Sequence, residues 1–94
     1  MKMLMAIVDS NRKEEFEIVL RNQGIKGYTE IPEVNGFGST GMRMSSLVHP
    51  GSSAIIYALL EENELTSVVD KIKEFCAECS QHLKLMHWDV QVEM

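Results

Sequence analysis

The sequence lacks any hydrophobic run long enough to cross a bilayer. Its two longest apolar stretches, Met3–Val8 and Ala54–Leu60, contain six and seven residues, whereas a membrane-spanning helix needs about 20. Asp9, Ser10 and Asn11 follow the first stretch at once, where a signal peptide would continue its apolar core. We therefore expect a cytoplasmic protein that meets a membrane only through a membrane-protein partner.

Basic residues are few and scattered. Nine Lys and Arg stand against fourteen Asp and Glu, which gives a net charge of −5. Proteins that bind a nucleic acid backbone gather basic side chains on one face or segment. The sequence therefore predicts that nucleic acid is not a partner.

Cysteine is scarce as well. The two cysteines, Cys76 and Cys79, are too few for a disulfide framework and would be thiols in a reducing compartment. The sequence fixes no Ser-His-Asp or Cys-His arrangement, and its carboxylates lie mainly on polar helix faces. We therefore expect a protein that is not an enzyme.

What the sequence does contain is enough apolar material for a folded core. Hydrophobic residues make up 45% and charged residues 24% of the 94 positions, near the average for soluble domains. A chain of this length forms one domain, which we place at residues 1–94. So small a domain has a marginal core of its own, so burial against further copies is expected.

The hydrophobic pattern predicts two repeats of strand, helix and strand. Short apolar runs indicate strands, spacings of three and four residues indicate helices, and alternation indicates a strand with one polar face. Asn11 and Asn63 are plausible caps at the helix starts, and Gly24 is a plausible helix end. In order, we expect a strand at 3–8, a helix from 11 to 24, an irregular strand within 25–37, a long loop at about 38–53, a strand at 54–60, a helix through 65–79 and a strand at 84–92.

This order predicts an α+β fold of the ferredoxin-like βαββαβ type, a sandwich with a four-stranded antiparallel sheet and both helices on one face. Pro32 restricts the second strand to a sheet edge or a bulge. The strands at 3–8 and 54–60 are apolar at odd and even positions alike, so the face away from the helices must also be covered. We therefore expect a closed homo-oligomer in which sheets pack against one another.

One segment carries a family resemblance. The run from Gly24 to Gly38, Gly-Ile-Lys-Gly-Tyr-Thr-Glu-Ile-Pro-Glu-Val-Asn-Gly-Phe-Gly, precedes the long loop and resembles the P-II nitrogen-regulatory signal proteins. In that family a Gly-Ile-X-Gly segment after a helix leads to Val-X-Gly-Phe-Gly and then to a flexible signalling loop. The resemblance implies a homotrimer, an effector cleft between subunits, and a loop that binds or releases partner proteins.

The resemblance also implies roles for individual residues. It assigns Val34, Asn35, Gly36, Phe37 and Gly38 to the effector cleft and to the root of the loop. A purely structural interpretation of the two glycines stays open. They would relieve backbone strain where the strand bends into the loop, with Phe37 as a hydrophobic plug.

The turn after the second helix bears on the identity of the effector. In classical members of the family this turn is rich in glycine and lysine and binds phosphate, whereas here it runs Glu78-Cys-Ser-Gln-His-Leu-Lys84. Lys84 is its one cation, and no glycine frees backbone N–H groups to wrap a phosphate. We therefore expect ATP to bind more weakly than about 100 μM, and a smaller or less charged effector in place of classical ATP and 2-oxoglutarate.

The loop itself carries Met42, Arg43, Met44 and His49. Unbranched methionine repacks against varied partners, which favours a docking surface for a partner protein. The same thioethers and imidazole suit monovalent copper, and an inert tether is a third interpretation.

A metal site is the alternative function. Cys76, Cys79, His82 and His87 have a spacing that suits zinc or copper if the histidines complete a shell across the helix-to-strand turn. Cysteines on a helix stripe are also simply small hydrophobic core residues. With a metal bound, the chain would be a metal-responsive or metal-buffering trimer of similar fold.

Overall fold

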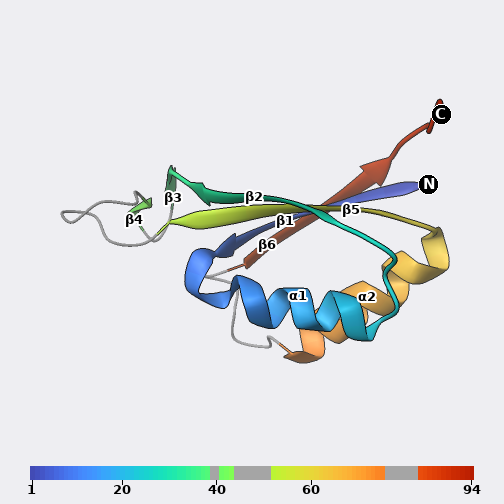
Figure 1. The fold of residues 1–94 in the computed structure, drawn as a ribbon, viewed down its shortest axis with the longest axis horizontal. Helices are drawn as coiled ribbons and strands as arrows, with labels where there is room; N and C mark the ends of the chain where they lie inside the picture. The colour runs from blue at the N-terminus through green and yellow to red at the C-terminus, as the bar shows by residue number, and fades with distance from the viewer. Residues whose placement is uncertain (39–40, 44–51, 76–82) are drawn as a thin grey trace.

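The computed structural model describes the backbone of residues 1–38, 41–43, 52–75 and 83–94, and their side chains except at 37, 38, 41–43 and 75. Figure 1 shows the elements in their arrangement. Along the chain they are β1 (Lys2–Asp9), the 3₁₀ turn η1 (Ser10–Arg12), α1 (Lys13–Asn22), β2 (Thr29–Val34), β3 (Gly36–Gly38), β4 (Gly41–Arg43), β5 (Ser53–Leu60), α2 (Glu62–Phe75) and β6 (Leu83–Asp89).

Strands β2, β5, β1 and β6 form one antiparallel sheet in that order, and α1 and α2 lie side by side on one of its faces (Figure 1). This arrangement confirms the predicted ferredoxin-like α+β fold. Strands β3 and β4 form a separate two-stranded sheet. The prediction of a loop over about 38–53 was therefore wrong at Gly41–Arg43, which pairs with Gly36–Gly38.

The core lies between the sheet and the helices. Alternate residues of β1 and β5 point toward the helices, because successive side chains of a strand lie on opposite faces, and they meet helix residues spaced three or four apart. Each large side chain buried there contributes roughly 1.5–3 kcal/mol relative to exposure. The buried core consists of Leu4, Ala6, Val8, Phe16, Leu20, Ala54, Ile56, Ala58, Leu60, Leu65, Val68 and Ile72.

Helix α1 ends as the sequence predicts. Gly24 has a φ of 76°, a left-handed conformation that glycine adopts without strain. Its N–H donates to the carbonyl of Arg21, and the N–H of Ile25 donates to the carbonyl of Leu20, which is the Schellman pattern of helix termination. The predicted cap at Asn11 was wrong, because η1 occupies residues 10–12 and no side chain caps the start of α1.

Replacement of Gly24 by alanine tests this helix end. We expect Gly24→Ala to lower the free energy of unfolding by about 1 kcal/mol, because alanine is strained at a positive φ. Chemical denaturation measures the change. Gly27→Ala is the matched control, since Gly27 has no positive φ and an added Cβ would meet no atom within 4 Å there. Equal stability of the two variants would contradict the assignment.

Helix α2 begins one residue before the predicted cap. Asn63 lies inside the first turn, because the N–H of Leu65 already donates to the carbonyl of Glu61 at 2.9 Å. The Glu64 carboxylate accepts a hydrogen bond from the N–H of Glu61 at 2.9 Å, as in one half of a capping box. A carboxylate in the first turn also suits the positive end of the helix dipole. None of the helices among the described residues is long and apolar enough to cross a membrane.

Strand β6 is shorter than predicted. It ends at Asp89, which pairs with Lys2, the first residue of β1. The N–H of Val90 still donates to the carbonyl of Met1 at 3.0 Å. The alternation of residue types continues to 92, but the pairing with β1 ends at Asp89, so residues 90–92 are not strand.

Strand β2 lies at an edge of the sheet, and its pairing with β5 shifts register between Ile31 and Val34. Pro32 lies in this irregular stretch, as predicted, because proline has no N–H to donate. Glu33 beside it has a φ of 53°, a conformation that costs a residue with a Cβ about 1 kcal/mol or more. Strand β2 therefore pairs at residues 29–31 and again at Val34, with strained backbone between.

Candidate functional site

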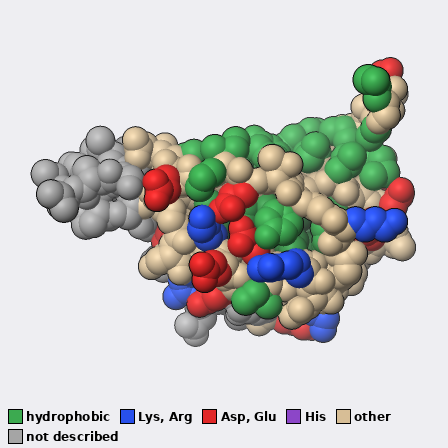
Figure 2. All heavy atoms as spheres, viewed as in Figure 1, with side chains coloured by type: hydrophobic (Ala, Val, Ile, Leu, Met, Phe, Trp, Pro, Cys, Tyr) green, Lys and Arg blue, Asp and Glu red, His purple; other side chains and the backbone are tan. Residues whose placement is uncertain are grey.

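The sheet face away from the helices is apolar. In β1 and β5 the residues that alternate with the core residues point to this face, and most of them are partly exposed. Figure 2 shows hydrophobic side chains along the edge of the molecule above the sheet, on the side away from the helices. The register places in this face Met3, Met5, Ile7, Ile31, Ile55, Tyr57, Leu59, Met86 and Trp88. We call these nine residues the outer apolar face.

The predicted effector residues lie where β2 gives way to β3. Val34 is the last residue of β2 and pairs with Ser53 of β5, and Asn35 joins it to β3. Ser52, which is 5% exposed, hydrogen-bonds Ser10 through their side-chain oxygens at 2.7 Å. The N–H of Ser10 also donates to the carbonyl of Ser52 at 2.9 Å. The two ends of the segment between residues 34 and 53 therefore pair with each other in the sheet, and the second end is also hydrogen-bonded to η1.

Gly36 has no conformational reason to be glycine. Its φ is not positive, and a Cβ built on it would meet nothing within 4 Å among the described residues. At Gly36 the described residues therefore give no support to the strain-relief interpretation. A glycine also permits a close approach of another backbone or of a ligand.

Lys84 does not lie near Gly36 within one chain. It is exposed, near the start of β6, and pairs with Ile7 on the outer apolar face. Strands β1 and β5 separate β6 from β2. Three strand spacings of about 4.8 Å put these two edges about 14 Å apart. The structure therefore places two parts of the predicted effector site at opposite edges of the sheet.

The remaining predicted residues are mostly outside the described part of the chain. Met44, His49, Cys76, Cys79 and His82 lie outside it. Met42 and Arg43 belong to β4, where they pair with Phe37 and Gly36 of β3.

Only His87 of the predicted metal set is among the described residues. It is exposed and lines a cavity of about 260 Å³ with Lys2, Thr66 and Asp70. No group of three or more His, Cys, Asp or Glu side chains in the described ranges is placed to bind a metal ion.

A cluster of charged residues between α1 and β2 had no signal in the sequence analysis. Glu17 of α1 is only 8% exposed. Burial raises the pKa of its carboxyl group, and the negative charge of Glu30 and a hydrogen bond with it raise that pKa further, against Lys13 and Arg21. Lys13 Nζ lies 3.0 Å from Glu30 Oε1 as an ion pair. That oxygen is buried and receives no hydrogen bond of favourable geometry.

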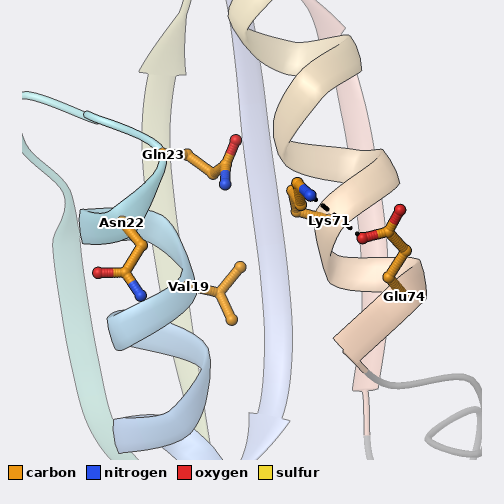
Figure 3. A pocket seen from close by; sticks show the side chains of 5 residues that line it. All are labelled: Val19, Asn22, Gln23, Lys71 and Glu74. Carbon is orange, nitrogen blue, oxygen red and sulfur yellow. Dashed lines mark hydrogen bonds and ion pairs between the residues drawn. The ribbon is translucent and has the colours of Figure 1, made fainter.

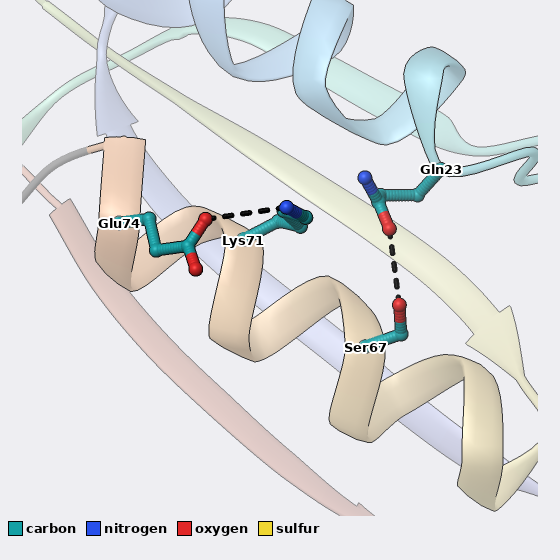
Figure 4. Close-up of polar contacts among 4 residues, drawn as sticks. All are labelled: Gln23, Ser67, Lys71 and Glu74. Atoms are coloured by element: carbon teal, nitrogen blue, oxygen red, sulfur yellow. Dashed lines mark hydrogen bonds and ion pairs between the residues drawn. The ribbon is translucent and has the colours of Figure 1, made fainter.

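A second cavity, of about 330 Å³, opens between α1 and α2 (Figure 3). It is lined by Val19 and Asn22 of α1 and by Gln23, which directly follows α1. Lys71 and Glu74 line it from α2. The Ser67 hydroxyl donates to Gln23 Oε1 at 3.0 Å, and Lys71 pairs with Glu74 at 3.3 Å (Figure 4). The ion pair is more than half exposed on both sides, so it contributes little, and the Ser67 contact joins the two helices.

Comparison with known proteins gives a family match. Residues 1–87 match the sequence profile of the family described as nitrogen regulatory protein P-II. No curated protein sequence matches the chain.

Solved structures of one relative share the fold. CPII, a nitrogen regulatory PII-like protein from Thiomonas intermedia K12 bound to ADP, AMP and bicarbonate, is 25% identical with a TM-score of 0.81, over 99% of this chain and 88% of that chain. Its complex with ADP and bicarbonate is 26% identical with a TM-score of 0.81 and the same coverage. The apo form of CPII is 21% identical, with a TM-score of 0.75 over 97% of this chain and 89% of that chain, and at that identity it shows the fold alone.

Proposed function

Because the chain belongs to the P-II family of nitrogen regulatory proteins, we propose that it is a regulator without catalytic activity that assembles as a homotrimer. It binds a small effector where β2 leads toward residues 38–53. It acts on a partner protein through that segment, in which Met42, Arg43, Met44 and His49 are the contact residues. The family match over residues 1–87 is the observation that carries this proposal.

The outer apolar face supports the assembly. Ile31, Leu59 and Trp88 in it are 43%, 40% and 43% exposed, and such a continuous apolar surface marks an interaction site in a soluble protein. Three copies arranged around an axis with their sheets inward would cover this face on every copy and leave no further copy to add.

The two separated parts of the effector site support a site shared between copies. Gly36 follows β2 at one edge of the sheet, and Lys84 lies in β6 at the other edge. In a ring, the β2 edge of one copy meets the β6 edge of its neighbour. Gly36 of one copy and Lys84 of the next then approach the same ligand, which accounts for a glycine that its own chain does not require.

The effector we propose is ADP or AMP together with bicarbonate. Structures of the relative CPII contain ADP, AMP and bicarbonate, and each of these carries less charge than ATP. A single lysine, Lys84, in a chain of net charge −5 neutralises little of a triphosphate. ATP is therefore expected to bind more weakly than about 100 μM, or about −5.5 kcal/mol.

Calorimetric titration with ADP, AMP, bicarbonate and ATP tests the site. We expect ADP or AMP to bind more tightly than ATP, and both Gly36→Val and Lys84→Ala to weaken that binding at least about tenfold, the equivalent of 1.4 kcal/mol. The unfolding midpoint of Gly36→Val should change little, because a Cβ at this position meets no atom of the described residues within 4 Å. Lys73→Ala is the matched control for Lys84→Ala. It removes an exposed lysine in the last turn of α2, which is not part of the proposed site. Tight ATP binding that both variants abolish would restore the classical ligand.

A mixing experiment tests whether the site is shared. Gly36→Val and Lys84→Ala chains are unfolded together, refolded and titrated with ADP. If the two residues come from neighbouring copies, about one quarter of the sites in randomly mixed rings regain both. If both residues act within one copy, the mixture regains none, and the shared site is excluded.

A further inference from the structure

We propose that the carboxyl groups of Glu17 and Glu30 form a pH-sensitive contact that fastens the edge strand β2 to α1 and loosens as this pair loses its proton. We call these two residues the carboxyl pair. The proposal concerns the scaffold next to the effector site, and it does not depend on what the effector is.

The two carboxyl groups belong to one partly buried charged cluster between α1 and β2. Glu17 of α1 is 8% exposed, its carboxyl group hydrogen-bonds that of Glu30, and Lys13, one turn earlier on α1, forms an ion pair with Glu30. Glu30 lies on the face of β2 that meets the helices, since it pairs with the core residue Ile56. Its Oε1 is buried, and Lys13 Nζ at 3.0 Å supplies a charge but no well-aligned hydrogen bond. A protonated Glu17 donates a hydrogen bond to the Glu30 carboxylate, whereas an ionised Glu17 has no proton to donate.

The charges around the carboxyl pair favour the state in which the pair holds one proton. Lys13 and Arg21 of α1 and Glu30 of β2 act on Glu17, and Glu33 of β2 acts on Lys13. With all five groups ionised, three carboxylates face two cations in a partly dehydrated space. One proton on the carboxyl pair removes this excess, because two adjacent carboxylates favour sharing a proton.

Apart from the contacts of Glu30 with Glu17 and Lys13, strand β2 is weakly fastened. It is an edge strand with β5 as its one neighbour in the sheet, and its register shifts after Ile31. Pro32 donates no hydrogen bond, and Glu33 is in a strained conformation. A contact from α1 to Glu30, immediately before this irregular stretch, therefore affects how often β2 separates from the sheet.

The direction of the pH effect follows from the raised pKa of Glu17. The closed form binds more protons than the opened form between the ordinary glutamate pKa of 4.5 and the raised value. The stabilising contribution is therefore present at low pH and is lost as pH rises through the raised pKa. Because Val34 continues the same strand, loosening reaches the root of the 34–53 segment.

Amide hydrogen exchange of the free protein tests the proposal. Protection factors, corrected for intrinsic exchange, are measured for residues 30, 31, 33 and 34 from about pH 5 to about pH 8. In the wild type they should fall with rising pH, by up to about tenfold for each unit by which the pKa of Glu17 is raised. In Glu17→Gln they should be independent of pH, because the amide donates a hydrogen bond at every pH.

Two further variants keep the test decisive. Glu15→Gln, an exposed glutamate on α1 whose side chain lies away from the carboxyl pair, should behave as the wild type. Glu30→Gln should reduce the pH dependence without abolishing it, because burial, the largest cause of the raised pKa of Glu17, remains, and it serves if Glu17→Gln does not fold. A pH dependence that persists in Glu17→Gln, one that is undiminished in Glu30→Gln, or a wild-type protein without one, would overturn the proposal. No effector is added, so failure here leaves the proposed function untouched, and failure of nucleotide binding leaves this result untouched.

Discussion

Ile55→Asp should convert the assembled protein into monomers or aggregates. Ile55 lies in the middle of the outer apolar face, between Ile7 of β1 and Ile31 of β2 in the register of the sheet. An aspartate there would lose its hydration when sheets pack together, and an unpaired buried carboxylate costs several kcal/mol. Size-exclusion chromatography with light scattering measures the mass in solution, which should fall from that of three chains toward 10.7 kDa, the mass of one.

Two further isoleucine-to-aspartate variants serve as controls, one at an exposed position and one in the core. Ile18→Asp makes the same exchange on α1 at a residue that is already 51% exposed, so it should leave the assembly intact. Ile56→Asp, one residue along β5, places the charge at a position that is 1% exposed and should prevent folding altogether. A wild-type protein that is a stable monomer would refute the trimer whatever the variants do.

Phe16→Ala should remove a large part of the stability of the fold. Phe16 is 2% exposed and is among the largest fully buried side chains, packed between α1 and the sheet. Truncation of a buried phenylalanine costs about 3–5 kcal/mol, out of about 5–14 kcal/mol for a domain of this length. Urea denaturation at a fixed protein concentration measures the loss, because assembly makes apparent stability depend on concentration.

The neighbouring position controls for a general effect of substitution in α1. Glu15→Ala, at an exposed residue, should change the free energy of unfolding by less than about 0.5 kcal/mol. A loss below about 1 kcal/mol for Phe16→Ala would mean that α1 does not pack on the sheet as described.

Much of this fold follows from local pattern. The strands at 3–8 and 54–60 were predicted because their apolar runs are short, and their two-sided apolar character predicted an outer face that is apolar as well. The end of α1 at Gly24 was predicted because a positive φ is a property that one residue type supplies by itself. Pro32 placed β2 at an edge for an equally local reason, the missing N–H.

The predictions that failed depend on partners distant in the sequence. Strand β6 ends where its pairing with β1 ends, at Asp89 opposite Lys2, and the alternation of residues 90–92 does not report that. At the start of α2, the Glu64 carboxylate accepts from the N–H of Glu61, whereas the residue type at Asn63 had suggested a cap there. Gly41–Arg43 became strand because Gly36–Gly38 lies opposite, although glycine and arginine have little strand preference.

The candidate site divides in the same way. The Gly36-Phe-Gly38 motif was visible in the sequence, but that Gly36 is free of strain could only be seen in the backbone. Glu17 appeared as one glutamate among several on a helix. Its burial and its interaction with Glu30, thirteen residues later, arise only when α1 packs beside β2.

The serine contacts at the base of the 34–53 segment have a consequence for how the protein can diverge. Ser10 fastens Ser52, and Val34 pairs with Ser53, so the segment is closed at its base by residues that belong to the scaffold. Doubling the length of a chain segment closed in this way adds only about 0.6 kcal/mol of closure entropy. As far as closure entropy is concerned, insertions and deletions in the segment therefore cost the fold little. Related chains can vary in the length of this segment while the sheet and the helices keep their own packing.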